Sequence, residues 1–234
     1  AVAVVLEDPG TRPGLRQRLA AAGLPMLEAT SVTHIRDSIE HALRLSRGAR
    51  VPAVMLVDRE ILQSMASVRV LPNRVGDGPP AGPPRRRGLR WDEVGGPLRI
   101  ARRLELNSVR AMPSPGERSA IGFIVAGPAE RSLRRIEVIL GVEGRVPTLH
   151  LAVSNPLDAA AIERVLLRCE KVVVLEPAGQ RIELVVSGIA QRLALDGQSP
   201  AAVWGHELPD GSSPARLIHP SPLARVLAPL IQRI

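Results

Sequence analysis

Residues 146–177 read "VPTLHLAVSNPLDAAAIERVLLRCEKVVVLEP", a pattern that predicts a strand, a helix and a second strand. The apolar runs 146–153 and 172–175 have the length and composition of strands that are buried on both faces, as in a parallel sheet. Between them, Asp158 can cap a helix whose apolar residues recur along one side, namely Ile162, Val165, Leu166 and Cys169. A strand, a helix and a parallel strand within about 30 residues form a βαβ crossover. The stretch therefore predicts an α/β fold.

The same pattern continues on both sides of this stretch. A strand is expected at 121–126, and a fourth strand at 201–204. Helices are expected at 130–140 and 179–196. These elements place a C-terminal α/β domain at residues 119–234.

The N-terminal part also has an α/β pattern. Strands are expected at 1–6, 24–29 and 51–57, with a helix at 31–47. Two or three parallel strands make a thin sheet with exposed edges. We therefore expect residues 1–71 to be the second half of a larger α/β domain, or to be completed by a partner chain.

Residues 72–100 are dense in Pro and Gly, which are typical of a linker rather than of a regular element. We extend this linker to residue 118. The fold class predicted from the whole sequence is α/β, with two three-layer pieces and mainly parallel sheets.

The chain has a formal net charge of +8, which raises the question of nucleic acid. Its arginines are scattered, only Lys171 is lysine, and no aromatic residue interleaves with the Arg cluster at 85–87 to stack on bases. A solvated linker is therefore favoured over an anionic partner for that cluster.

The single cysteine, Cys169, fits a reduced compartment, and no apolar stretch is long enough to span a membrane. The chain opens on a strand without a basic segment before it, so we expect no signal peptide and a cytoplasmic location.

Several short motifs in the N-terminal part carry a family resemblance. They are Asp8-Pro9 after a strand, "LPMLEA" at 24–29, "ALRLS" at 42–46 and "VPAVMLVDR" at 51–59. In this order they resemble the end of the pyrimidine-binding domain in the large subunit of indolepyruvate:ferredoxin oxidoreductase. Residues 1–71 would then be the C-terminal half of that domain.

The C-terminal part resembles the next domain of the same subunit, which is transketolase-C-terminal-like. The motifs are "IGFIVAG" at 121–127, Asn155-Pro156-Leu157, Val174-Leu175-Glu176 and "WGHELP" at 204–209. Pro177 departs from the family pattern, since a second Glu is common there.

The resemblance implies a thiamine-diphosphate enzyme that oxidatively decarboxylates 2-oxoacids such as arylpyruvates. Such an enzyme forms acyl-CoA and passes electrons through iron–sulfur clusters to ferredoxin. The family's activating Glu lies upstream of residue 1, its diphosphate-binding domain downstream of residue 234, and one cysteine cannot hold a cluster. We therefore expect no cofactor on this chain alone and no catalytic residue in it. Thiamine diphosphate, Mg²⁺ and iron–sulfur clusters would belong to a complete enzyme, formed as a homo-oligomer or with other subunits.

Two sets of residues are candidate binding positions. Glu7 and Asp8 follow a strand, and by the resemblance their loop would face the cofactor or substrate cleft. The family's polar continuation is replaced here by "RPGLRQR" at 12–18, which weakens this assignment. Ser154, Asn155 and Glu176 follow strands at the carboxyl edge of the predicted sheet, where open α/β sheets bind ligands. They are expected to form a substrate-facing or partner-facing rim.

No metal site is expected. The triplet Gly76-Asp77-Gly78, with Asn107 further on, approximates the motif by which thiamine enzymes hold Mg²⁺, but it runs into a Pro-rich segment that cannot start a helix. Asp77 is read as a turn residue. The five histidines show no metal-ligand spacing, and His150 is read as a core or near-core residue of a strand.

Two functions remain open at this point. The chain is either a part of a 2-oxoacid:ferredoxin oxidoreductase, inactive on its own, or a non-catalytic structural or interaction module derived from that family.

Overall fold

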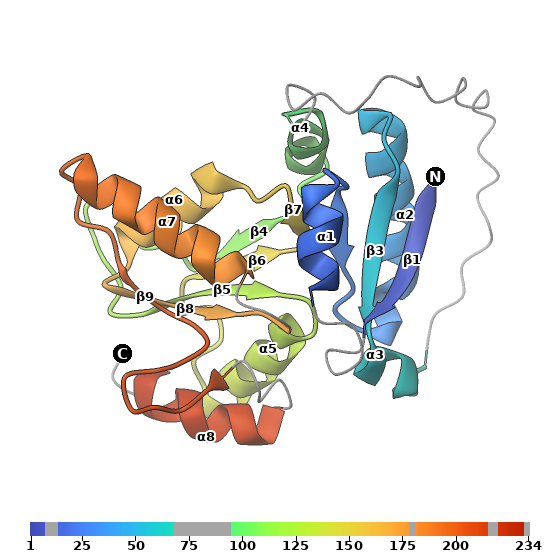
Figure 1. Cartoon of the computed structure of the whole chain (residues 1–234). Helices are drawn as coiled ribbons and strands as arrows, with labels where there is room; N and C mark the ends of the chain where they lie inside the picture. Colours follow the sequence, from blue (N-terminus) through green and yellow to red (C-terminus); the bar gives the residue numbers. More distant parts are fainter. Residues whose placement is uncertain (8–13, 68–94, 178–180, 215–219, 232–234) are drawn as a thin grey trace.

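The computed structural model describes residues 1–7, 14–67, 95–177, 181–214 and 220–231, and it contains two sheets with helices on both faces of each (Figure 1). The predicted fold class is confirmed: both sheets are mainly parallel, and helices cover them. The apolar runs 51–57, 121–126 and 172–175 supply buried strands, because a strand covered on both faces needs apolar side chains at successive positions.

The N-terminal sheet has four strands in the order β1-β3-β2-β7. Three come from the N-terminal part and run parallel, as predicted: β1 (Val2–Glu7), β2 (Met26–Glu28) and β3 (Ala53–Asp58). The fourth, β7 (Val153–Asn155), pairs antiparallel with β2. The sequence analysis looked to a larger domain or a partner chain to complete this sheet, but at the β2 side the chain's own C-terminal part supplies the strand.

Helices pack on both faces of this sheet. One face holds α2 (Ile35–Ala49) and α4 (Gly95–Arg103), and the short 3₁₀ helix η1 (Val32–His34) leads directly into α2. The other face holds α1 (Leu15–Ala21). A short helix, α3 (Arg59–Gln63), follows β3. The predicted helix at 31–47 corresponds to η1 and α2.

The predicted linker is wrong over its last part, because α4 and β4 (Ser108–Arg110) lie within 72–118. Pro97 falls in the first turn of α4, where a missing N–H is tolerated, and the apolar Ile100 and Ala101 then face the core. A Cβ at Gly48 would lie 3.1 Å from the Ile100 side chain, so this glycine of α2 lets α4 approach closely. Residues 72–94 lie outside the described residues.

The C-terminal sheet has five strands in the order β4-β6-β5-β8-β9, of which only β4 is antiparallel to its neighbour. The other four fall within or overlap the predicted strands: β5 (Gly122–Ala126), β6 (Thr148–Leu151), β8 (Lys171–Leu175) and β9 (Ala202–Trp204). The strand predicted at 146–153 is shorter than expected, since Val153 belongs to β7. Since β5 lies between β6 and β8 and pairs parallel with both, β6 and β8 run parallel and are separated by one strand.

Two helices cover each face of the C-terminal sheet (Figure 1). One face holds α6 (Ala159–Arg168) and α7 (Arg181–Leu195), and the other holds α5 (Ala129–Leu140) and α8 (Pro220–Ile231). Asp158 caps α6 as predicted, since its carboxylate accepts the backbone N–H of Ala161 at 3.1 Å. The sequence analysis assigned no element to residues 220–231, which form α8 with Leu223, Leu227 and Ile231 as a buried stripe along it.

Candidate functional site

The candidate site lies where the chain crosses from one sheet to the other. After Leu151 the chain leaves the C-terminal sheet, and from Val153 it runs as β7 beside β2. Asn155 secures this crossing, because its side-chain amide donates to the carbonyl of Leu24 at 2.8 Å. Ser154 and Asn155 therefore lie at the junction of the two sheets.

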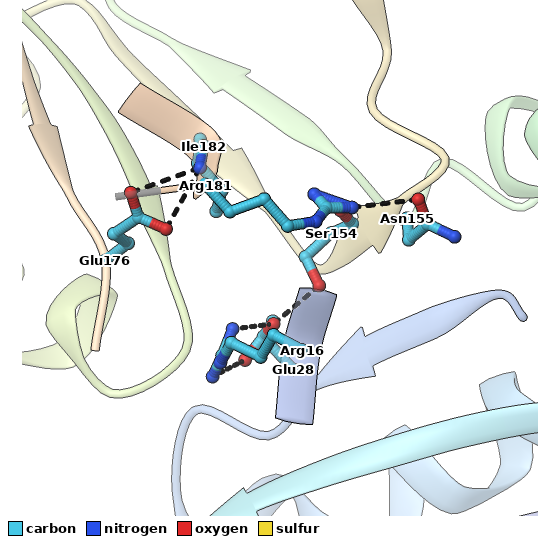
Figure 2. A network of polar contacts seen from close by, with 7 residues as sticks. All are labelled: Arg16, Glu28, Ser154, Asn155, Glu176, Arg181 and Ile182. Atoms are coloured by element: carbon cyan, nitrogen blue, oxygen red, sulfur yellow. Dashed lines mark hydrogen bonds and ion pairs between the residues drawn. The ribbon is translucent and has the colours of Figure 1, made fainter. Parts of the chain in front are cut away.

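A buried ion pair faces Ser154 across this junction (Figure 2). The Arg16 guanidinium, from α1, meets the Glu28 carboxylate, at the end of β2, in a two-pronged contact of 2.5 and 2.9 Å. Their side chains are only 6% and 2% exposed. The hydroxyl of Ser154 donates to the same carboxylate at 2.5 Å. Such charge-assisted, bidentate contacts are among the strongest hydrogen bonds in proteins.

Arg181, at the start of α7, contacts the other side of the β7 backbone. Its guanidinium donates to the carbonyl of Ser154 at 2.8 and 3.0 Å, and to the Oδ1 atom of Asn155 at 2.8 Å. Burial lowers the pKa of Arg181, and the neighbouring Arg16 acts in the same direction, while Glu176 and Glu28 oppose them.

Glu176 follows β8 and caps α7. Its carboxylate accepts the N–H of Ile182 on both oxygens and the N–H of Glu183 on one, all at 3.1 Å. Burial raises the pKa of Glu176 to about 7; these backbone N–H groups and the Arg16 charge lower it in part. Two guanidinium groups and two carboxyl groups therefore gather at this junction.

The raised pKa of Glu176 predicts a pH-dependent stability. Below pH 4.5, the ordinary pKa of this group, the Glu176 carboxyl is protonated in both the folded and the unfolded chain. Between pH 4.5 and about 7 it is protonated in the folded chain and ionised in the unfolded one. The folded state therefore loses stability as pH rises through this window, by at most about 1.4 kcal/mol per pH unit, and does not regain it above. We expect Glu176→Gln to lack this slope, measured as the difference between parent and variant in urea unfolding across the window. Parallel curves for the two proteins would contradict it.

The predicted open rim is not what the structure shows at these positions. Ser154 and Glu176 are buried and Asn155 is half-buried, and all three make contacts within the chain. The physical reason is that the N-terminal unit packs Glu28 against Ser154, while α7 folds back so that its first N–H groups meet Glu176. Their role in binding a substrate or partner stays a prediction.

The other predicted positions are placed as follows. Glu7 ends β1 in register with Asp58, and Asp8 lies outside the described residues, as does Asp77.

Asn107 has a structural contact, because its Oδ1 atom accepts the N–H of Val153 at 2.9 Å. His150 lies in β6, and burial lowers its pKa. Within the described ranges no three His, Cys, Asp or Glu side chains group as metal ligands would.

A separate cleft of about 480 Å³ lies between α4, β4 and the start of α6. One wall is the pair of Arg102 and Asp158, joined by two hydrogen bonds of 2.6 and 2.9 Å. Glu105 and Arg164 line it as well. The contact with Arg102, together with the Ala161 N–H, lowers the pKa of Asp158. The cleft does not reach Ser154 or Glu176, and the sequence analysis did not find it because its wall contains α4, which was read as linker.

Sequence reasoning missed Arg16, Glu28 and Arg181 as members of the junction. One signal was available: Glu28 is an acidic residue in the otherwise apolar segment "LPMLEA". A buried acid in such a segment needs a partner, but its position in the sequence does not identify Arg16.

Together the two sheets and their covering helices define a two-unit α/β protein. Among solved structures, one that is similar is the 2-oxoglutarate:ferredoxin oxidoreductase from Magnetococcus marinus with 2-oxoglutarate, coenzyme A and succinyl-CoA bound. It has a TM-score of 0.52 and 14% identity, covering 87% of this chain and 45% of that one. Another is a split-gene transketolase described as an inactive β4 tetramer, with a TM-score of 0.52 and 15% identity over 99% of this chain and 65% of that one.

At this level of identity the likeness shows the fold alone, and the chain spans 45% and 65% of the lengths of these two proteins. It supports the predicted relation to oxidoreductases and transketolases of this α/β type at the level of the fold. No family model and no curated protein matches the sequence. None of the described helices is long and apolar enough to cross a membrane.

Proposed function

We propose that this chain is a non-catalytic part of a thiamine-diphosphate-dependent 2-oxoacid:ferredoxin oxidoreductase, with an indolepyruvate-like arylpyruvate as the substrate of the complete enzyme. The observation that carries the proposal is that both acids at the strand ends, Glu28 and Glu176, are engaged in contacts within the chain. Glu28 is paired with Arg16, and Glu176 caps α7, so neither acid is available for proton transfer to a ligand. The similar fold over 87% of the chain supports the choice of enzyme class.

The described residues do not fit thiamine diphosphate with its metal. Mg²⁺ requires a set of oxygen ligands, and the nearest candidate in this part of the chain, Asn107, already accepts from Val153. The aminopyrimidine of the cofactor requires an accessible carboxylate, whereas Glu28 and Glu176 are buried in internal contacts. In the proposal, thiamine diphosphate, Mg²⁺ and iron–sulfur clusters come with other chains, which also meet ferredoxin and coenzyme A.

We therefore expect that calorimetric titration of the isolated chain with thiamine diphosphate and MgCl₂ gives no binding heat. Oxidation of indolepyruvate or 2-oxoglutarate with a dye as electron acceptor should be absent as well. One-to-one micromolar binding that disappears in Asp77→Ala would overturn both the proposal and the interpretation of Asp77 as a turn residue.

The partner is tested by purifying the chain from its native source and weighing the intact complex by native mass spectrometry. A partner chain that carries a Gly-Asp-Gly motif and paired cysteine motifs supports the proposal. A monomer, or a complex without such a chain, overturns it.

The second candidate is a structural or interaction module without a role in thiamine chemistry. The hydrogen bond from Ser154 to Glu28 favours it, because this buried contact ties the C-terminal part of the chain to the N-terminal unit, and Glu28 is at the same time paired with Arg16. A homo-oligomer that contains only this chain would be the outcome of the same mass measurement that supports this second function.

A further inference from the structure

We propose that the cleft between α4, β4 and α6 binds a small zwitterion with an apolar body, that is, a dipeptide or a free α-amino acid. The carboxylate of this ligand meets Arg164 and the start of α6, and its ammonium group meets Glu105 at the end of α4. This inference goes beyond the proposed function and does not rest on it, because the cleft is separate from the junction of the two sheets.

The cleft offers free space with an apolar surface. Its volume of about 480 Å³ lies within the range of small-molecule sites. Val109 and Leu149, which lie opposite each other on β4 and β6, form an apolar part of the lining, and Ala160 and Ala161 of α6 continue it. The lining therefore combines apolar side chains with a few polar groups, as small-molecule sites do.

The wall at the start of α6 favours a carboxylate. Asp158 caps this helix and accepts the N–H of Ala161, whereas the N–H of Ala160, the second residue of the helix, has no acceptor within the helix. Ala160 and Arg164 are four residues apart, so they lie on one face of α6, and both line the cleft. The contact with Arg102 lowers the pKa of Asp158 most, and the Arg164 charge adds to this effect. The Arg164 charge thus acts at the positive end of the helix, where anions bind.

The wall at the end of α4 favours an ammonium group. The helix closes with a turn in which the N–H of Glu105 donates to the carbonyl of Arg102 at 3.1 Å, and the N–H of Leu106 donates to that of Ala101 at 3.0 Å. Glu105 has a φ of +51° in this turn, at a position that glycine usually fills. Leu106 is buried, whereas Glu105 lines the cleft. A carboxylate at the negative end of a helix attracts a cation.

The two remaining charges of the cleft are available to a ligand. Arg102 and Asp158 neutralise each other through their two hydrogen bonds. Among the described residues, in contrast, neither the Glu105 carboxylate nor the Arg164 guanidinium has a hydrogen bond or an ion pair. The cleft therefore has one unpaired acid and one unpaired base, from different helices. A ligand with a single charge pairs with only one of them, whereas a zwitterion pairs with both.

The test is calorimetric titration of the full chain with alanyl-leucine, for which we expect one-to-one binding. Acetylation of the amino group or amidation of the carboxylate should each weaken this binding by at least about tenfold, because each change removes one ion pair. Free leucine is titrated in parallel. Tighter binding of leucine identifies a free amino acid as the ligand, and tighter binding of alanyl-leucine identifies a dipeptide.

Two variants locate the ligand in the cleft. Glu105→Gln should bind alanyl-leucine and its acetylated form with equal affinity, since the acid that pairs with the ammonium group is gone. Arg164→Gln should bind the dipeptide and its amide equally. Both residues are exposed, so both variants should fold as the parent does. Glu117→Gln and Arg131→Gln change exposed residues away from the cleft lining and should bind as the parent does.

Absence of binding of both zwitterions at concentrations up to about 10 mM would overturn the proposal. Equal binding of the acetylated or amidated dipeptide by the parent would do so as well, as would unchanged preferences in either cleft variant. Tighter binding of inorganic phosphate than of any zwitterion would contradict the class of ligand. None of these titrations involves thiamine diphosphate or a partner chain, so failure here is separable from failure of the proposed function.

Discussion

Replacing Arg16 by alanine should lower the free energy of unfolding by about 3–5 kcal/mol. The change removes the guanidinium that neutralises the Glu28 carboxylate while that carboxylate stays buried, with a side chain only 2% exposed. Ser154 can still donate to Glu28, but a single hydroxyl does not replace a bidentate cation. Breaking one side of a buried pair costs more than the pair itself contributes, because it strands a charge in a low-dielectric environment.

The matched control is Arg44→Ala in α2. Arg44 pairs with Glu40 one helical turn away, with both side chains about half exposed, so its loss should cost at most about 1 kcal/mol. Urea unfolding of both variants at neutral pH provides the comparison. Similar losses for Arg16 and Arg44 would mean that the junction pair is screened by water, against the burial seen in the structure.

Replacing Leu166 by alanine should cost about 2–5 kcal/mol. Leu166 is fully buried on α6, within the core between the C-terminal sheet and α7. Truncation removes apolar contacts and leaves a cavity. The α6 helix cannot move to fill this cavity, because β7 precedes it and β8 follows it in the chain and both are fixed in sheets.

Leu184→Ala in α7 is the control for this prediction, since that side chain is 67% exposed. Its unfolding free energy should stay within about 0.5 kcal/mol of the parent. If Leu184 proved as costly as Leu166, then the exposed face of α7 would be covered in solution, for instance in an oligomer, and the two measurements would need to be repeated at several protein concentrations.

Most of the strands were predictable because their signal is local. An apolar run such as Val172–Leu175 is long enough for a strand and too short for a helix, and it carries that information wherever it folds. The helix after Asp158 was predictable for the same reason, from one capping residue and a stripe of apolar side chains. The α4 helix was missed because Pro and Gly mark loops on average, whereas at this position the helix is stabilised by packing on α2. No element was predicted for α8, which is stabilised by packing on α5.

The junction was only half predictable. Ser154, Asn155 and Glu176 were recognised as strand-end residues, which follows from their place after apolar runs. Their burial was not predictable, because it depends on Arg16 and Glu28, which are 126 or more residues away from Ser154 along the chain.

The sequence by itself determined the class of fold, since the alternation of apolar runs and amphipathic segments permits little else than strands and covering helices. It also determined where the strand ends bring polar side chains. Only the tertiary structure decided that β7 leaves its own sheet to join β2, and that Glu28 then fills the space beside Ser154. The physical reason is that a buried charge must find a countercharge in space, and the distance along the chain imposes no rule on which residue supplies it.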